Sequence, residues 1–163
     1  MTSRFAHYDP VEIRRVQPDG AVLLSGTNLR VRVAVLKPGF VLASAYGEVL
    51  DAEDFSAEIA LLAELDRELD RAGTLTVFAD LRESPRMPVA SRRRIAGWMR
   101  RHQARLLPSH VLVQSKLIEI ALSTITMLVG GGLFKMHTNP QAFLDLLKKV
   151  APKLSELPRA PEQ

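Results

Sequence analysis

The sequence contains no cysteine, which excludes disulfide bonds and thiolate chemistry. It also lacks a segment that could cross a membrane, because its most apolar run, residues 117–134, carries a glutamate and three consecutive glycines. The first fifteen residues have no apolar core of the kind that a secretory signal requires. These absences predict a cytoplasmic protein without a transmembrane segment.

Motifs for catalysis and cofactor binding are missing as well. The sequence has no Ser-His-Asp order, no G-x-S-x-G elbow and no pair of catalytic carboxylates. Glycines 130–132 come after an apolar helical pattern, which favours a helix end and a tight turn over a phosphate loop. The four histidines lie in different predicted elements without metal-ligand spacing. We therefore expect no enzyme activity, no cofactor and no metal site.

The composition is that of a globular protein with a sizeable core, with 47% hydrophobic and 25% charged residues in a chain of 163. Its formal net charge of +4 is modest but unevenly distributed. Residues 82–105 contain eight arginines and a single acid, Glu83, whereas residues 51–70 are strongly acidic. We predict an N-terminal β extension over residues 1–40, an α/β domain over 41–152 and a flexible tail over 153–163.

The N-terminal part of the chain follows the pattern of antiparallel strands. In residues 29–36 the apolar side chains alternate with polar ones, and Arg30 and Arg32 occupy the second face. This period of two is typical of a half-buried antiparallel strand. Pro-Gly turns at residues 18–20 and 37–39 separate neighbouring strands. Three or four antiparallel strands are expected here.

From residue 40 onward, predicted strands and helices alternate four times. The helical patterns cover residues 51–72, a segment from Pro88 or Ser91 to Leu107, and residues 116–129. A last helix begins at Asn139-Pro140 and ends before Pro152. Such alternation favours a parallel sheet covered by helices, because parallel strands need crossover connections. The predicted fold is therefore α/β, a mixed and mainly parallel sheet covered by about four helices, with an antiparallel N-terminal extension.

Three passages carry a family resemblance. They are "GEVLDAEDFSAEIALLAEL" at residues 47–65, "VFADLRES" at 77–84 and "FKMHTNPQAFLDLL" at 134–147. They resemble, respectively, the opening strand and helix, the next strand with its functional loop, and the last strand and helix of STAS domains. The variant that this chain is most similar to is the bacterial STAS-like group related to CRAL-TRIO lipid-transfer folds. The resemblance implies a non-enzymatic interaction module in bacterial signalling or scaffolding, or alternatively a binder of an apolar or lipid ligand.

The anti-sigma-factor antagonists of that family carry a phosphorylatable serine in an Asp-Ser-Ser-Gly element at the start of the second helix. The corresponding residues here are "MPVAS" at 87–91, in which the aspartate, the serine pair and the glycine are missing. Ser91 is the nearest hydroxyl and Ser84 the next. We expect Ser91 to cap its helix, since serine is favoured at that position. The alternative is that Ser91 or Ser84 is a phosphorylated switch.

The arginines of the predicted helix 88–107 gather on one side and admit two interpretations. They form either a solvated face partly paired with the acidic helix 51–72, or a docking surface for an acidic protein, a phosphorylated group or a lipid headgroup. Nucleic acid is not expected, because no exposed aromatic residues are interleaved with the arginines. The predicted partner-binding residues are Arg82, Ser84, Arg86, Ser91, Arg93, Arg94, Arg100 and Arg101.

Two further features have alternative interpretations. Asp80 ends a predicted strand, where α/β folds place ligand groups, or else it pairs with Arg82. The helix at 116–129 has a second apolar stripe beside its inward face. We expect the N-terminal extension to cover this stripe. Otherwise the stripe marks a homodimer surface or the mouth of an apolar cavity. The stripe comprises Leu117, Ile120, Thr124 and Met127, and the inward face Ile118, Ala121, Leu122, Ile125, Leu128 and Val129.

Overall fold

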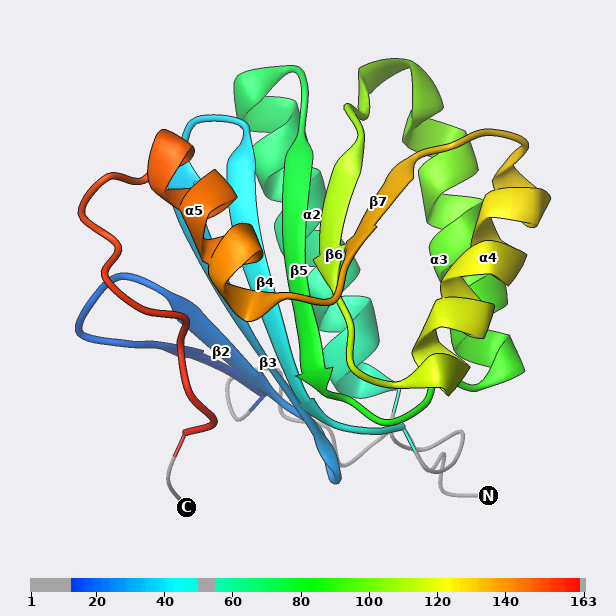
Figure 1. The fold of residues 1–163 in the computed structure, drawn as a ribbon, viewed down its shortest axis with the longest axis horizontal. Coiled ribbons are helices and arrows are strands. Elements are labelled where there is room, and N and C mark those ends of the chain that lie inside the picture. The colour runs from blue at the N-terminus through cyan, green and yellow to red at the C-terminus, as the bar shows by residue number, and fades with distance from the viewer. Residues whose placement is uncertain (1–12, 50–54, 162–163) are drawn as a thin grey trace, which may run out of the picture.

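The computed structural model describes residues 13–49 and 55–161 and contains a single seven-stranded sheet with helices on both faces (Figure 1). Its strands are β1 (Arg14–Val16), β2 (Val22–Ser25), β3 (Leu29–Lys37), β4 (Phe40–Gly47), β5 (Thr76–Glu83), β6 (Ser109–Leu112) and β7 (Phe134–His137). The helices are α2 (Ser56–Ala72), α3 (Val89–His102), α4 (Lys116–Val129) and α5 (Pro140–Val150), with a 3-10 turn, η3 (Gln103–Arg105), after α3.

The strands lie in the sheet in their order along the chain. β1 to β4 are paired antiparallel, and β4 to β7 are paired parallel. In β3, Leu29, Val31 and Val33 are buried on one face while Arg30 and Arg32 are half-buried on the other. This alternation confirms the strand predicted at residues 29–36.

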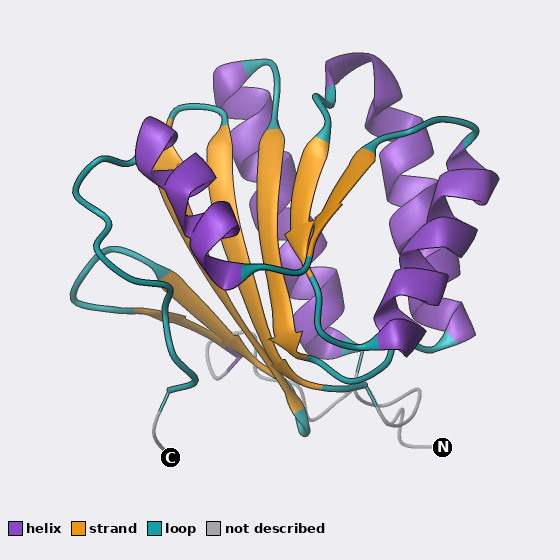
Figure 2. Ribbon diagram, in the orientation of Figure 1, coloured by secondary structure: helices purple, strands orange, loops and turns teal. Residues whose placement is uncertain are grey.

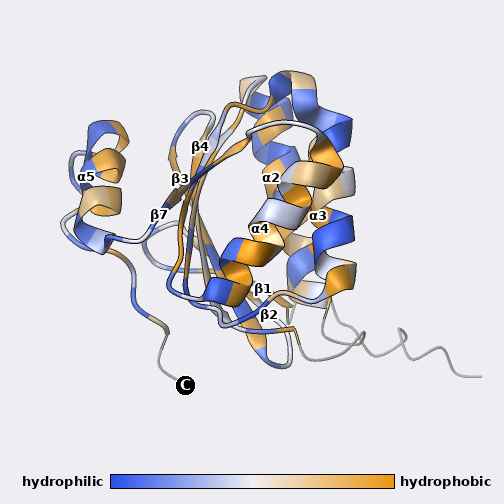
Figure 3. Cartoon of the chain, turned by 45° about the vertical axis from the view of Figure 1, so that its right-hand side comes forward, coloured by the Kyte–Doolittle hydropathy of each residue, from blue (hydrophilic) through white to orange (hydrophobic). Residues whose placement is uncertain are grey.

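The handedness of the crossovers decides which face each helix covers. α2, α3 and α4 connect successive parallel strands, and every connection moves one strand further in the same direction. Because such crossovers are right-handed, all three helices must lie on one face of the sheet. α5 follows the edge strand β7 and lies on the opposite face, as Figure 3 shows.

Local capping explains where several helices begin and end. The Asn139 side chain accepts hydrogen bonds from the backbone N–H groups of Gln141 and Ala142, and Pro140 is the first residue of α5. α2 and α4 end at Gly73 and Gly130, each with a φ of 87° that favours glycine. The predicted helix end at glycines 130–132 is therefore confirmed, whereas the start predicted for the first helix, at residue 51, lies outside the described residues.

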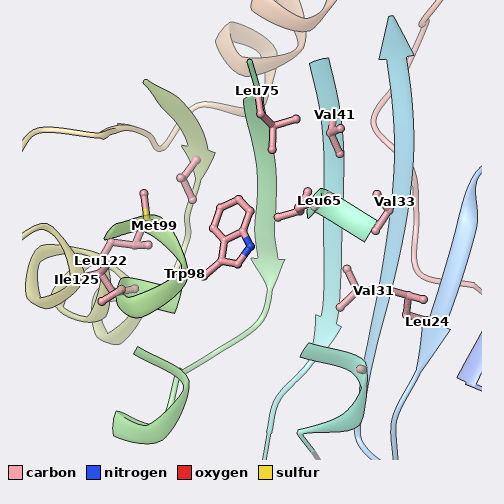
Figure 4. Packing of buried hydrophobic residues seen from close by; sticks show 14 of the residues in the cluster. Leu24, Val31, Val33, Val41, Leu65, Leu75, Trp98, Met99, Leu122 and Ile125 are labelled. Atoms are coloured by element: carbon pink, nitrogen blue, oxygen red, sulfur yellow. The ribbon is translucent and has the colours of Figure 1, made fainter. Parts of the chain in front are cut away.

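The alternation of strand side chains produces two apolar clusters. The larger one lies between α2, α3, α4 and the sheet, where Figure 4 shows Val31, Val41, Leu65, Trp98 and Ile125 among its members. The smaller one lies beneath α5 and comprises Leu42, Phe78, Leu112, Phe143 and Leu147, with Leu154 and Leu157 of the C-terminal tail packed against it.

The predicted fold class is confirmed. The sheet is mixed, four helices of the described part of the chain cover it, and an antiparallel group of strands precedes the parallel β4–β7 part (Figure 2). The antiparallel strands continue the same sheet, so the apolar face of β3 contributes to the larger cluster. The division of the chain at residues 40 and 152 stays a prediction.

Candidate functional site

Ser91 lies inside helix α3 and does not cap it. Pro88 is the N-cap residue, with an extended ψ of 159°, and α3 begins at Val89. The Ser91 side chain is only 1% exposed, and its Oγ donates a hydrogen bond to Oε2 of Glu58 at 3.2 Å. The predicted capping role is therefore wrong. Because the helix starts two residues before Ser91, the Ser91 hydroxyl is directed towards Glu58 of α2 and does not cap the free N–H groups of α3.

Glu58 of α2 is a buried acid that two residues of α3 surround. Besides Ser91, the Nη1 atom of Arg94 donates to Oε2 of Glu58 at 2.7 Å. The Arg94 guanidinium also lies over the ring of Phe55, 4.3 Å from its centroid. Burial raises the pKa of Glu58, and the charge of Arg94 with the two hydrogen bonds opposes this rise. The sequence hinted at this acid, because position 58 lies on the apolar side of its helix.

The end of β5 and the loop that follows it are held in place by hydrogen bonds of charged and hydroxyl side chains. Arg82 donates from Nε and Nη2 to the two carboxylate oxygens of buried Asp80, at 3.0 and 2.9 Å. Ser84 donates from Oγ to the carbonyl oxygen of Gly47 at 2.6 Å. Local pairing of Asp80 with Arg82, one of the two interpretations of that residue, is thus what the structure shows.

Arg86 is also paired, since its Nε lies 2.7 Å from Oε2 of Glu48. Arg92 donates from Nε to the carbonyl oxygen of Met87 at 3.1 Å. Four of the five arginines between residues 82 and 94 therefore have partners of their own, Arg94 with Glu58 included. Their positive charge mainly fixes the loop and the start of α3.

The outer face of α3 carries the remaining arginines. Arg93, Arg100 and Arg101 are exposed, and none of them has a hydrogen-bond or ion-pair partner among residues 13–49 and 55–161. The arginines of the predicted partner site are thus divided into those paired with other residues and three exposed ones without partners among the described residues. A role of these three arginines in binding another molecule stays a prediction.

A second set of contacts fixes the orientation of α3 against α2. Trp98 donates from Nε1 to Oδ1 of Asp66 at 2.7 Å, and Nε2 of His102 lies 3.2 Å from the same oxygen. The rings of Trp98 and His102 are 4.9 Å apart. Together with Arg94, these residues form the side of α3 that faces α2. The acidic helix therefore pairs with part of the arginine-rich helix, which is one element of the first of the two interpretations of the arginines.

A cavity of about 170 Å³ lies between α2, α3, α4 and the sheet. Its lining is mostly apolar and includes Leu62, Val77, Trp98, Leu122 and Ile125. Its polar lining comes from Glu58, Ser84, Arg86, Ser91 and Ser109. The position agrees with the expectation of an apolar space beside the helix 116–129, and ligand binding there stays a prediction.

The second apolar stripe of α4 is uncovered. Leu117, Ile120 and Met127 are 56%, 51% and 84% exposed, and Leu128, predicted to face the sheet, is 42% exposed. The expectation that the N-terminal extension covers this stripe is wrong for the described part of the extension, residues 13–40. The reason is the strand order, which places β1–β3 at the sheet edge opposite β7 and α4.

A pair of histidines on the other face of the sheet was not predicted from the sequence. His110 of β6 and His137 of β7 approach to 3.0 Å between Nδ1 and Nε2, and the His110 ring stacks on Phe78 at 5.1 Å. Burial lowers the pKa of His110, with further lowering by His137 and Lys135. Spacing alone does not reveal the pair, because the parallel register of β6 and β7 brings the two residues together.

No helix in the described part of the chain is both long and apolar enough to span a membrane. No protein-family model matches the sequence, and the comparison with curated proteins finds no match. Among solved structures, the fold is similar to an uncharacterized protein from the DUF3478 family with a SpoIIAA-like fold from Shewanella loihica PV-4. The TM-score is 0.51 and the identity 18%, over 74% of this chain and 94% of that chain. The chain therefore has a SpoIIAA-like fold, the fold of STAS and anti-sigma-factor-antagonist domains.

Proposed function

We propose that this chain is a non-enzymatic STAS-like interaction module in bacterial signalling or scaffolding, which docks an acidic or phosphorylated partner through α3. The observation that carries the proposal is the exposure of Arg93, Arg100 and Arg101 without partners among the described residues. A guanidinium that has no acid of its own offers its N–H donors to a carboxylate or phosphate, often through two parallel hydrogen bonds.

The arginines contribute mainly orientation and association rate. Exposed ion pairs contribute only about 0–1 kcal/mol each, because both charges stay largely hydrated. Complementary charge across an interface nevertheless steers the encounter and disfavours wrong partners. The contacts of α3 with α2 through Glu58 and Asp66 hold the helix in place, so the exposed guanidinium groups are presented from a rigid surface.

Affinity capture from the native host tests this proposal. The variant Arg93→Glu/Arg100→Glu reverses two exposed charges on α3. The matched control, Lys148→Glu/Lys149→Glu, makes the same change of net charge on α5, which covers the opposite face of the sheet. We expect the acidic partner captured by the wild-type chain to be lost with the α3 variant and retained with the α5 variant. Equal recovery with both variants contradicts the proposal.

A regulatory part of this proposal concerns Ser84 and Ser91. Both side chains are buried and donate hydrogen bonds, to Gly47 and to Glu58. Phosphorylation of either serine would require the loop or the α2–α3 contact to open first. A phosphate on Ser91 would then act by repelling Glu58 and releasing α3. Mass analysis of the protein from its native host tests this part, and an unmodified mass under all growth conditions contradicts it.

The cavity supports a second candidate function, the binding or carriage of an apolar or lipid ligand. An apolar cavity of roughly 150 Å³ can hold a molecule of the size of benzene, whereas typical sites for larger ligands exceed roughly 300 Å³. The observed 170 Å³ therefore suits a small apolar molecule or the end of an acyl chain, with Arg86 near a negative headgroup.

Trp98 provides a readout for this second candidate, because it lines the cavity and is the one tryptophan of the chain. Titration with a short-chain fatty acid should change its fluorescence, and native mass spectrometry should detect the complex. The variant Ala45→Leu, which fills part of the cavity, should reduce both signals. Unchanged fluorescence and a bare-protein mass would remove this candidate.

A further inference from the structure

The exposed stripe of α4 and the outer face of α3 belong to one continuous surface. α3 packs against α4, and both helices follow parallel strands, so they run in the same direction. The α2 side of α3 is defined by Arg94, Trp98 and His102. At 100° per residue, Arg93 and Arg100 lie on the opposite side of α3, at its outer edge towards α4.

The exposed residues of α4 lie on the flank next to α3. Ala121 is fully buried and shares a flank of its helix with Leu117 and Leu128, at spacings of four and seven residues. Since α3 is the helix that packs against α4, this is the flank that borders α3. The exposed fraction of the residue rises from 42% at Leu128 to 84% at Met127, which lies on the side of α4 that points away from the sheet. An apolar strip therefore lies beside the arginines of α3.

We propose that this α3–α4 surface, formed by Arg93, Arg100, Leu117, Ile120, Met127 and Leu128, binds an amphipathic α-helix of a partner protein. The partner helix carries apolar residues on one face and acidic residues seven positions apart along one flank. The inference rests on the proposed docking function of α3, and it adds the shape of the partner and the contribution of α4.

The dimensions fit a helix of about three turns. Leu117 and Leu128 are eleven positions apart, which corresponds to about 16 Å of helix rise. Arg93 and Arg100 are seven positions apart, or about 10 Å, so acids separated by seven positions on a partner helix can meet both. Apolar anchors supply the affinity that exposed ion pairs lack, as in other helix-in-groove complexes.

The charge pattern favours a helix over a lipid surface. Recognition of anionic membranes usually relies on clusters of about four to eight basic residues and on aromatic side chains at the interface. The α3 face presents three exposed arginines without partners among the described residues. The large hydrophobic residues exposed in the described part of the chain are all aliphatic or methionine.

A labelled synthetic peptide tests the proposal. The probe is a helical peptide with leucines at i, i+3, i+7 and i+10 and with glutamates at two flanking positions seven apart. A matched peptide carries lysines in place of the glutamates, and a third has the same composition as the probe in scrambled order. Fluorescence anisotropy should show binding of the acidic amphipathic peptide alone.

Variants of the protein localise the binding. Ile120→Ser/Met127→Ser and Arg93→Glu/Arg100→Glu should each weaken peptide binding about tenfold or more. Lys148→Glu/Lys149→Glu should bind as the wild type does. Each variant is compared by circular dichroism, and Leu117→Ser serves as a second α4 variant if the pair does not fold.

The outcomes separate this inference from the function on which it rests. In one outcome, Arg93→Glu/Arg100→Glu abolishes capture of the native partner, but the peptide does not bind to the wild-type protein or binds equally well to the α4 variants. The helix proposal is then overturned, and the docking function stands. If the arginine variant affects neither the partner nor the peptide, both are overturned. The helix proposal is also overturned if the protein binds vesicles of phosphatidylcholine and phosphatidylglycerol but does not bind the peptide. It is likewise overturned if the wild-type protein is a dimer that the substitution Ile120→Ser/Met127→Ser dissociates.

Discussion

Ser91 donates a hydrogen bond from Oγ to Oε2 of Glu58 at 3.2 Å and thereby joins α3 to α2 across 33 positions of sequence. Both side chains are buried, and Arg94 donates to the same carboxylate oxygen. The hydroxyl nearest to the phosphoserine position of the anti-sigma-factor antagonists thus holds two helices together. The arginines on the other side of α3 are presented to solvent from this fixed helix.

Substitutions of Ser91 should affect stability according to what they leave beside Glu58. Ser91→Ala removes a donor from a buried carboxylate and should lower the free energy of unfolding by about 1–3 kcal/mol. Ser91→Asp adds a second buried acid and should lower it by roughly 3 kcal/mol or more. Urea denaturation measures both, and Ser123→Ala on the exposed side of α4 is the control, expected within about 0.5 kcal/mol of the wild type. A Ser91→Asp protein as stable as the wild type would contradict the structural role of this contact.

Gly47 should not tolerate a side chain. Its φ is +91°, and an added Cβ would lie 2.0 Å from the carbonyl oxygen of Asn28. Gly47→Ala therefore combines backbone strain with a clash and should destabilise the fold by about 3 kcal/mol or more. Gly20 has a φ of +87° and open space around it, so Gly20→Ala should cost only about 1 kcal/mol. The melting temperatures of the two variants, measured by thermal unfolding, compare the two losses of stability. Equal melting temperatures would argue against the close approach of Gly47 in β4 to the residue before β3.

His110 should make stability depend on pH near neutrality. Its pKa in the folded protein is lowered from the ordinary value of 6.5 by burial, His137 and Lys135, so the unfolded chain binds a proton more readily. The stabilisation is complete above pH 6.5 and is lost as the pH falls from 6.5 through the lower folded-state pKa. Urea denaturation between pH 7.5 and pH 5 measures this loss.

The variant His110→Gln is the control for the pH effect, because it retains a polar side chain without the titration. The free energy of unfolding should depend less on pH in this variant than in the wild type. Identical profiles for the two proteins would show that the pH dependence arises elsewhere, for example from the carboxylates, whose effects appear at lower pH.

Much of the fold could be predicted because local signals agree with the tertiary structure. The boundaries of α4 were predicted correctly at residues 116 and 129, where an apolar helical pattern ends at a glycine. Asn139 and Pro140 likewise predicted the start of α5, and they form its cap. The alternating residues of β3 predicted both its type and its buried face.

The candidate site was harder to predict because its partners are distant in sequence. Serine is favoured at helix starts, yet Ser91 turns towards Glu58, which follows from the packing of α3 on α2. The pairing of Arg86 with Glu48 likewise depends on β4 and β5 being neighbours. The arginines could be located from the sequence, but their division into paired and exposed groups could not be predicted, since that division depends on the orientation of α3.

That division is the central claim, and one comparison tests it directly. For Arg82→Gln and for Arg93→Glu/Arg100→Glu, both the free energy of unfolding and the recovery of the native partner are measured. Arg82→Gln leaves Asp80 buried without its ion pair and should cost roughly 2–4 kcal/mol while the remaining folded protein keeps its partner. The α3 variant should keep wild-type stability and lose the partner. If instead the α3 variant unfolds more easily than Arg82→Gln and retains the partner, the account is contradicted.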